Sequence, residues 1–331
     1  MSATFRAYIV NKTEAGFSAA LQELSQKDLP ADEVLVKVVY SGVNYKDGLA
    51  ASPDGRVVRS YPMVPGIDLV GVVEESSDAR FKAGDEVLAT SYDLGVSHYG
   101  GFSEYARVKA DWIVPRPAEL TPFETMALGT AGFTTALAIY QLVRNGLKPE
   151  NGKVLVTGAT GGAGSIAVNI LSNLGYTVVA STGKASEHDY LRELGASEII
   201  ERSITSAESQ RPLEKETWAG AIDSVGGSTL AYLLRTTKYG GSVAAFGNAG
   251  GFNFNASVYP FILRGVSLLG IDSVYCPMEL RREIWQLLAH SYKPPRLLSH
   301  IGHEQPLEKL PDALSRILKG GMRGHTVIKI G

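Results

Sequence analysis

A strand, a glycine-rich turn and a helix follow one another between residues 153 and 174. Residues 153–157 are mostly apolar, as in a buried strand, and apolar residues recur at helical spacing from Ile166 to Leu174. Between them stand glycines at 158, 161, 162 and 164. Glycine lets the backbone approach a ligand closely, and the start of a helix favours negative charge. The sequence therefore predicts a dinucleotide-binding fold, with the pyrophosphate on Thr160, Gly161, Gly162 and Ala163.

The segment after the next strand, 177–180, indicates which dinucleotide binds. A site that prefers NAD usually carries Asp or Glu here to hold the ribose 2′-OH. This chain reads Ser181-Thr182-Gly183-Lys184, with no acid. Two hydroxyls and an ammonium suit a 2′-phosphate, which accepts charge-assisted hydrogen bonds. We therefore expect NADPH, held by Ser181, Thr182 and Lys184 and also by Arg202. The alternative for Lys184 and Arg202 is a solvated surface charge.

Composition limits the possible partners. The 331 residues include 32 Lys and Arg against 34 Asp and Glu, a net charge of −2. This balance gives no basic excess for nucleic acid or an anionic membrane, so we expect a small-molecule substrate and neither of those partners. The only cysteine, Cys276, cannot form an intrachain disulfide, and its expected role is structural. We expect a cytoplasmic protein for three reasons. The chain has a single cysteine, it starts with a polar segment, and it has no apolar run of membrane-spanning length.

The order of predicted elements indicates an α/β protein of two domains. Strand signals separated by Gly, Pro and Asp turns fill the first 120 residues, as in a small β-barrel. From about residue 127 strands and helices alternate, which predicts a Rossmann-like, doubly wound parallel sheet. The last segment, with a strand at 326–330, is expected to return to the first domain. The predicted domains are 1–125 with 297–331, and 126–296.

Five segments in this arrangement resemble the medium-chain dehydrogenase/reductase superfamily, over nearly the whole chain. They are Ser41-Gly42-Val43-Asn44-Tyr45-Lys46-Asp47, Pro65-Gly66-Ile67-Asp68-Leu69-Val70-Gly71, Gly84-Asp85-Glu86-Val87, Gly100-Gly101-Phe102-Ser103-Glu104-Tyr105 and Gly129-Thr130-Ala131-Gly132-Phe133-Thr134. The resemblance implies that the first domain is a GroES-like catalytic domain and that the second binds the nucleotide.

The chain departs from the zinc alcohol dehydrogenases of that superfamily at the metal ligands. Those enzymes place Cys-His where this chain has Asn44-Tyr45, and Gly-His-Glu where it has Gly66-Ile67-Asp68. A catalytic zinc needs three protein ligands, and a structural zinc lobe needs four cysteines. The sequence therefore predicts a zinc-independent member with no metal site.

Within the zinc-free members, the chain resembles the acryloyl-CoA reductase and quinone oxidoreductase subgroup. The residues that carry this resemblance are Asn44-Tyr45-Lys46-Asp47, 260–266, 269–273 and Arg323-Gly324-His325-Thr326. The resemblance implies NADPH-dependent reduction of an activated C=C bond, with acryloyl-CoA or a related 2-enoyl thioester as acceptor. An NADPH:quinone oxidoreductase is the first alternative. A noncatalytic NADPH-binding or sensing protein is the second.

The reaction itself suggests roles for three residues in the segment where the zinc enzymes have Cys-His. Hydride transfer to Cβ of an enoyl thioester builds negative charge on the thioester oxygen, which needs hydrogen-bond donors where no metal acts. Asn44 and Tyr45 are the candidates to orient the carbonyl and the nicotinamide, and Tyr45 could also donate the proton. Asp47 could fix Tyr45 or Lys46, or relay a proton. Alternatively, Tyr45 packs against the nicotinamide and Asp47 caps a helix.

The remaining candidates are binding residues. Phe246 and Gly247 follow a predicted strand, and Asp272 and Ser273 follow another, at the sheet edge where α/β folds bind ligands. Arg264 and Arg323 are candidates to hold CoA phosphates, with a structural ion pair as the alternative for each. Val266 to Leu269 is expected to form the outer strand of the sheet, whose unpaired edge predicts a homodimer.

Overall fold

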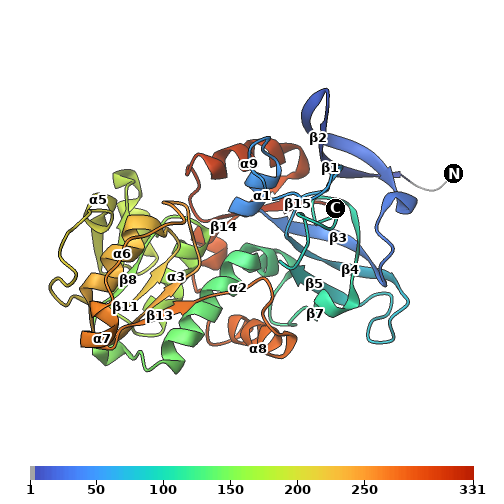
Figure 1. Cartoon of the computed structure of the whole chain (residues 1–331). Coiled ribbons are helices and arrows are strands. Elements are labelled where there is room, and N and C mark those ends of the chain that lie inside the picture. The colour runs from blue at the N-terminus through green and yellow to red at the C-terminus, as the bar shows by residue number, and fades with distance from the viewer. Residues whose placement is uncertain (1–3) are drawn as a thin grey trace. The chain divides into compact units, whose positions relative to one another are not determined.

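The computed structural model describes residues 4–331, which divide into two compact units (Figure 1). The first comprises residues 4–130, 274–289 and 302–331, and the second comprises 131–273 and 290–301. The expected boundaries differ mainly at one segment, because 274–289 groups with the first unit. Helix α2 (Pro122–Arg144) contributes residues to both units and is interrupted at Gly129, where φ is 49° and ψ is −153°.

The first unit is built on a seven-stranded sheet in the order β14-β15-β3-β4-β5-β7, with β6 paired to β3. A separate antiparallel hairpin, β1–β2, precedes it. The strands are β1 (Thr4–Thr13), β2 (Gly16–Ser25), β3 (Val34–Gly42), β4 (Asp68–Ser76), β5 (Glu86–Thr90), β6 (Tyr105–Val108), β7 (Ile113–Pro115), β14 (Gly302–Pro306) and β15 (His325–Lys329). Its helices are α1 (Tyr45–Ala50), α8 (Met278–Ala289) and α9 (Leu310–Leu318).

Apolar side chains from distant parts of the sequence make the core of this unit. Val36, Leu69, Phe102 and Ile328 are all fully buried within it. Strand β15 pairs antiparallel with β3, with Val327 opposite Gly42. The end of the chain is therefore part of the same sheet as residues 34–42, and it delivers His325 to the place where β3 ends.

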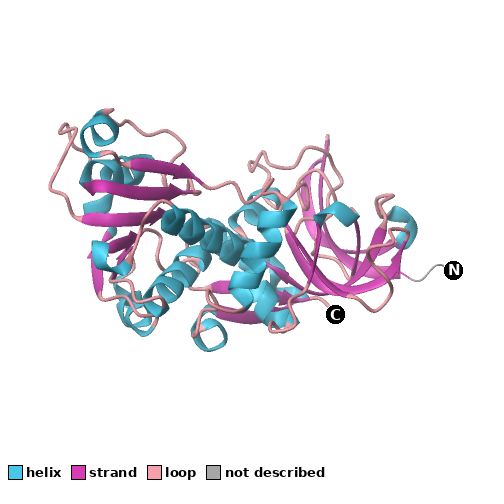
Figure 2. Ribbon diagram, turned by 90° about the horizontal axis from the view of Figure 1, so that it is seen from below, coloured by secondary structure: helices cyan, strands magenta, loops and turns pink. Residues whose placement is uncertain are grey.

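The second unit holds a six-stranded parallel sheet in the order β10-β9-β8-β11-β12-β13. Figure 2 shows helices packed around its strands. The strands are β8 (Val154–Val156), β9 (Val178–Thr182), β10 (Glu198–Glu201), β11 (Trp218–Asp223), β12 (Thr237–Ala245) and β13 (Ser267–Gly270). The helices are α3 (Gly162–Asn173), α4 (His188–Glu193), α5 (Arg202–Thr205), α6 (Gly227–Thr236) and α7 (Tyr259–Arg264).

Burial explains why the central strands of this sheet are mostly apolar rather than alternating. Every residue of β8, β9 and β11 is buried, as expected for a parallel sheet covered by helices on both faces. The predicted α/β fold is confirmed. It combines a β-rich first unit with a doubly wound second unit, in which β13 is one of the two outer strands.

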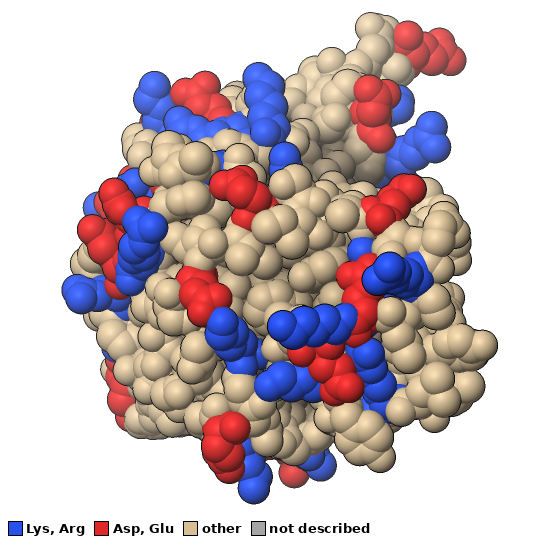
Figure 3. Space-filling model, turned by 90° about the vertical axis from the view of Figure 1, so that its left-hand side faces the viewer, with Lys and Arg blue, Asp and Glu red and all other residues tan. Residues whose placement is uncertain are grey.

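The surface charges and one apolar helix bear on the expected partners. On the face in Figure 3, Lys and Arg lie interspersed with Asp and Glu. Among residues 4–331 only α2 is long and apolar enough to cross a membrane by length and composition, contrary to the expectation that no apolar run reaches that length. In the most apolar 18-residue stretch of this helix, 72% is buried, as in the core helix of a folded protein.

Candidate functional site

The glycine turn after β8 brings helix α3 directly against the end of the strand. Gly158 has a φ of 58°, in the left-handed region that favours glycine. A Cβ on Gly164 would lie 2.3 Å from the carbonyl oxygen of Gly158, so any side chain there would force the helix away. Gly161 caps α3, whose first turn begins at Gly162. This backbone has the shape and the free helix start that a pyrophosphate needs.

Ser181 and Thr182 are the last two residues of β9, and their side chains have a different arrangement from the one that composition suggested. The Ser181 hydroxyl is buried and lies 3.0 Å from the Thr205 hydroxyl. The Thr182 hydroxyl is also buried and accepts the backbone N–H of Lys184 at 3.1 Å. Both predicted phosphate ligands therefore also stabilise the local fold.

Two cations, Lys184 and Arg202, lie together near the end of β9. The Arg202 guanidinium packs on Gly183, with its carbon 3.0 Å from the position that a Cβ would occupy. Burial lowers the pKa of Lys184, and the charge of Arg202 lowers it further, against the opposing effect of Glu187. Because like charges repel, an anion bound here would relieve the repulsion. These two cations suit a phosphate better than the hydroxyls do.

The loops after β11 and β12 pack on each other. Asp223 is buried and accepts the Thr157 hydroxyl at 2.6 Å and the backbone N–H groups of Val225 and Gly226 at 3.0 Å each. Burial raises its pKa, against these three bonds. A Cβ on Gly247 would lie 2.0 Å from the Ser224 carbonyl oxygen. Glycine is therefore needed at 247 for loop packing, independently of any ligand.

The other predicted binding residues of the second unit are dispersed. Phe246 is half-buried, and its backbone N–H bonds to Asp223 O. Asp272 is exposed, whereas Ser273 is buried and accepts the Thr134 hydroxyl at 2.8 Å. Arg264 donates to three backbone carbonyls, those of Glu214, Arg235 and Thr237. The guanidinium of Arg264 thus fixes the start of β12, which is a structural role rather than the predicted phosphate contact.

In the first unit, the Asn44–Asp47 segment forms the start of α1. Tyr45 is 42% exposed, whereas Asp47 is fully buried. The Asp47 carboxylate accepts the backbone N–H of Asn44 at 2.8 Å and that of Ile67 at 2.9 Å. Asp47 therefore caps the helix and joins it to the 65–67 loop, which is the alternative role considered for it, and these contacts do not fix Tyr45 or Lys46.

Sequence reasoning missed Asp68, which is fully buried beside Asn44. Its carboxylate accepts the Asn44 side-chain amide at 2.7 Å, the Thr130 backbone N–H at 2.8 Å and the Thr130 hydroxyl at 2.5 Å. The Thr130 hydroxyl lies 3.0 Å from that of Ser91. The signal that could have found Asp68 is its position in the segment where the zinc enzymes carry Gly-His-Glu.

Backbone strain marks the next loop of this network. Ser91 and Tyr92 have φ values of 65° and 50°, a conformation that costs energy for residues other than glycine. The fully buried Arg281 donates to the carbonyl and hydroxyl oxygens of Thr90 and lies 4.4 Å from the Tyr92 ring centre. Arg281 thereby supports the strained turn that carries Ser91.

Two further residues lie near the end of the chain. His325 is buried, and its Nδ1 bonds to the Ala127 carbonyl at 2.9 Å. Burial lowers the pKa of His325. The predicted phosphate ligand Arg323 is exposed, and its charge helps to lower the pKa of His303, an effect that is due first to burial.

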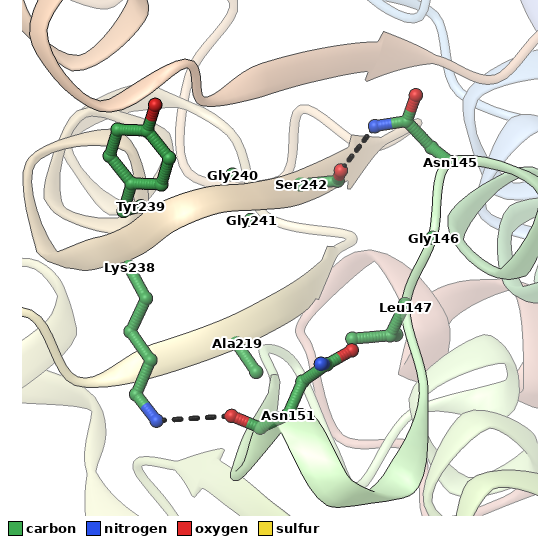
Figure 4. Close-up of a pocket in the computed structure, with 10 residues that line it drawn as sticks. All are labelled: Asn145, Gly146, Leu147, Asn151, Ala219, Lys238, Tyr239, Gly240, Gly241 and Ser242. Atoms are coloured by element: carbon green, nitrogen blue, oxygen red, sulfur yellow. Dashed lines mark hydrogen bonds between the residues drawn. The ribbon is translucent and has the colours of Figure 1, made fainter.

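Neither a metal cluster nor a surface hollow of the second unit adds to these sites. Over residues 4–331, no three His, Cys, Asp or Glu side chains are grouped to bind a metal. A hollow of about 170 Å³ lies at the amino ends of β11 and β12, where Lys238 donates to the Asn151 carbonyl and Asn145 donates to the Ser242 hydroxyl (Figure 4). Ligands of α/β folds bind at the opposite, carboxyl ends of strands.

Two known family models match this chain. The model of the alcohol dehydrogenase GroES-like domain matches residues 30–118, and that of the zinc-binding dehydrogenases matches 162–290. A Bacillus subtilis protein named "Putative quinone oxidoreductase YhfP" is 52% identical over all of both chains. The acrylyl-CoA reductase AcuI of Ruegeria pomeroyi is 49% identical over 98% of this chain and 99% of its own.

Solved structures agree with this similarity. The Salmonella enterica yhdH oxidoreductase, in complex with NADP, has a TM-score of 0.96 and 45% identity, over 98% of this chain and all of its own. Bacillus subtilis yhfP, with NAD bound, also has a TM-score of 0.96, over 99% of this chain and all of its own. The shared fold therefore holds either nicotinamide dinucleotide in these two structures.

The burial of Asp47 predicts a pH effect on stability. Burial, with the charge of Asp68, raises the pKa of Asp47 from 3.8 to about 7, against its backbone bonds. Such a group contributes stability that is fully present below about pH 4 and is lost as the pH rises through about 7. We expect the unfolding free energy of the wild type relative to Asp47→Asn to fall between pH 4 and 8, by up to about 4 kcal/mol.

Urea denaturation at a series of pH values measures this difference. Asp54→Asn, at an exposed position of the same unit, is the matched control and should show no such trend against the wild type. A wild-type advantage over Asp47→Asn that stays constant with pH would contradict the assignment.

Proposed function

Because this chain belongs to the medium-chain dehydrogenase/reductase family, in the branch of its acrylyl-CoA reductase and quinone oxidoreductase relatives, we propose that it uses NADPH to reduce an activated C=C bond. The acceptor is acryloyl-CoA or a related 2-enoyl thioester. The observation that carries the proposal is the loop that starts α1, where a half-buried amide and a half-exposed phenol stand together without a metal cluster in residues 4–331. Such neutral donors suit a carbonyl oxygen that gains negative charge.

NADPH would be held by the second unit and would supply the hydride. The turn at Thr160, Gly161, Gly162 and Ala163 binds the pyrophosphate, because its backbone leaves room for one and α3 starts there. Lys184 and Arg202 bind the 2′-phosphate, with Ser181 and Thr182 shaping their segment. Phe246, Gly247, Asp272 and Ser273 follow β12 and β13 at the carboxyl ends of the strands, the usual place for the nicotinamide.

The first unit would supply the groups that act on the acceptor. Asn44 donates from its side-chain amide to the thioester oxygen, which lowers the cost of the charge that develops there. Tyr45 is exposed enough to contact the substrate and the nicotinamide and to donate a proton to Cα. Asp47 keeps this loop in place through its bonds to Asn44 and Ile67. Arg323, which is exposed, binds a phosphate of CoA.

A quinone acceptor is the second candidate, because the Bacillus subtilis relative is named for that activity. We expect kcat/KM for acryloyl-CoA to exceed that for a benzoquinone by roughly tenfold or more, because only the thioester uses Arg323. Loss of NADPH absorbance with acryloyl-CoA, crotonyl-CoA and benzoquinone, measured side by side, makes the comparison. Faster turnover of the quinone would favour the second candidate, and no turnover of any acceptor would favour a noncatalytic NADPH-binding protein.

Arg323→Ala separates the two acceptors further. Loss of a charged hydrogen bond costs about 1.5–3 kcal/mol, so KM for acryloyl-CoA should rise roughly tenfold or more while KM for the quinone is unchanged. Arg264→Ala is the matched control, because Arg264 is committed to backbone carbonyls, and we expect it to lower stability without this selective change in KM. An equal KM for acryloyl-CoA in the wild type and Arg323→Ala would argue against a phosphate contact.

The preference for NADPH depends on Arg202. We expect Arg202→Ala to weaken NADPH binding by roughly tenfold or more and to leave NADH binding nearly unchanged, because only NADPH carries the 2′-phosphate. Arg192→Ala, which removes an exposed cation from α4, is the matched control. Isothermal titration calorimetry gives each Kd. If wild-type NADH binds as tightly as NADPH, the role of this segment is wrong.

We also propose a cytoplasmic homodimer formed along β13. The single cysteine suits a reducing compartment, and β13 is an edge strand. Exposed apolar side chains lie on β13 and beside it on and around α7, where Val258 is 61%, Ile262 68%, Leu263 57% and Leu268 36% exposed. A symmetric partner would cover this edge and these side chains.

Analytical ultracentrifugation tests the dimer. We expect the mass of two chains for the wild type and of one chain for Ile262→Glu with Leu268→Glu, because two buried carboxylates on each side of a symmetric contact would repel. Ile204→Glu, at another exposed apolar position of the second unit, should stay dimeric. A monomeric wild type would exclude the proposed contact.

A further inference from the structure

Asn44 is held on both sides by a buried carboxylate. Asp47 accepts its backbone N–H at 2.8 Å, and Asp68 accepts its side-chain N–H at 2.7 Å. Both carboxylates are fully buried. An amide nitrogen carries two hydrogens, so the Asn44 side chain still has one N–H after the bond to Asp68. The backbone bond places the residue, and the side-chain bond decides which end of its amide lies where.

Asp68 itself has little freedom to move. Thr130 donates to it twice, from its backbone N–H and from its hydroxyl, at the point where α2 resumes after the break at Gly129. A Cβ on Gly129 would lie 2.6 Å from Asp68 Oδ2, and one on Gly42 would lie 3.1 Å from it. Two glycines thus make room for this carboxylate, and three donors keep it in one orientation.

The charged state of Asp68 matters because an amide can turn over. An ionised carboxylate only accepts hydrogen bonds, so it selects the orientation in which Asn44 turns its nitrogen toward it. A protonated carboxyl group, or an amide in its place, can donate to the Asn44 oxygen instead. The amide could then turn by half a rotation and exchange its donor for an acceptor.

We propose that Asp68 is a positioning residue, which fixes the Asn44 side-chain amide as a hydrogen-bond donor toward the acceptor's carbonyl oxygen. The assignment rests on the proposed reduction, because it takes Asn44 as the donor to that oxygen. Asp68 does not touch the substrate in this role. It acts through Asn44 alone, and its effect on turnover disappears when that amide is removed.

Three charged or titratable groups face Asp68 from the elements around it. They are Asp47 of α1, His325 of β15 and Arg281 of α8. Burial raises the pKa of Asp68, and the bonds from Thr130 and Asn44 oppose the rise. Burial lowers the pKa of His325, the charge of Asp68 opposes this, and the charge of His325 in turn opposes the rise in the pKa of Asp68. The donor state of Asn44 is therefore lost as the pH falls and Asp68 takes up a proton.

A double-mutant cycle tests the assignment with the full chain and acryloyl-CoA. We expect Asn44→Ala and Asp68→Asn each to lower kcat roughly 100-fold, the usual effect of losing one oriented donor. NADPH affinity should stay close to the wild-type value in both variants. The combined variant should be no more than a few times slower than Asn44→Ala alone, because both changes remove the same donor. Independent losses that multiply in the combined variant would overturn the proposal.

A second variant keeps Asp68 and therefore the contact with α2. Asn44→Asp replaces the amide by a carboxylate of the same shape, so that only protonation restores a donor at this position. We expect its kcat to rise as the pH falls, whereas the wild-type kcat falls as Asp68 is protonated. Parallel pH profiles for the two proteins would contradict the assignment, even if Asp68→Asn fails to fold.

An NMR titration tests the same contact without substrate. The Asn44 side-chain amide signals, assigned by their loss in Asn44→Ala, should show a titration step in the wild type that is absent from Asp68→Asn, in which only the step due to Asp47 remains. Signals that do not shift in the wild type, or that shift equally in both, would overturn the proposal. Because this measurement needs no turnover, a failure of the positioning role is distinguishable from a wrong acceptor.

Discussion

The contact between Gly164 and the carbonyl of Gly158 determines how the second unit presents its carboxyl edge. No side chain fits between them, since a Cβ would lie 2.3 Å from that oxygen. The contact brings the first turn of α3 against the end of β8, and Ser165 and Gly161 hydrogen-bond within the same turn. The carboxyl ends of the neighbouring strands β9 and β11 are joined to it, through Ala159 to Ser181 and through Thr157 to Asp223. The close packing contact thus lies beside the carboxyl ends of three strands that are hydrogen-bonded to one another.

The first unit holds several charged and polar side chains in its interior. Asp47, Asp68, His325 and Arg281 are all fully or almost fully buried there. Each has at least one hydrogen bond to a backbone or hydroxyl group, which offsets part of the cost of its burial. The result is a stiff polar network under the loop that carries Asn44 and Tyr45. The carboxylates of Asp47 and Asp68 hold this loop by accepting N–H groups.

The sequence predicted those features that depend on local pattern. The alternation of apolar strands and helices after residue 127 was enough for the parallel sheet, and the glycines at 158–164 were enough for the turn. Asp68 and Arg281 could not be found in this way, because their partners are distant: Thr130 is 62 residues from Asp68, and Thr90 is 191 residues from Arg281. The role of Arg264 was also beyond local reasoning, since a guanidinium on a helix looks alike whether it faces a phosphate or three carbonyls. Only the folded chain distinguishes the two.

The packing of Arg202 on Gly183 has a consequence for engineering. A Cβ at 183 would lie within about 3 Å of three guanidinium atoms, so the glycine preserves the position of a residue nineteen places further along the chain. If this guanidinium binds the 2′-phosphate, then the discrimination between NADPH and NADH depends also on the residue at 183, through the position of Arg202. A designer who introduced an acid at 182 or 183 to favour NADH would leave it facing Arg202, which would neutralise it. A change of coenzyme would therefore need both sites to be altered in one step.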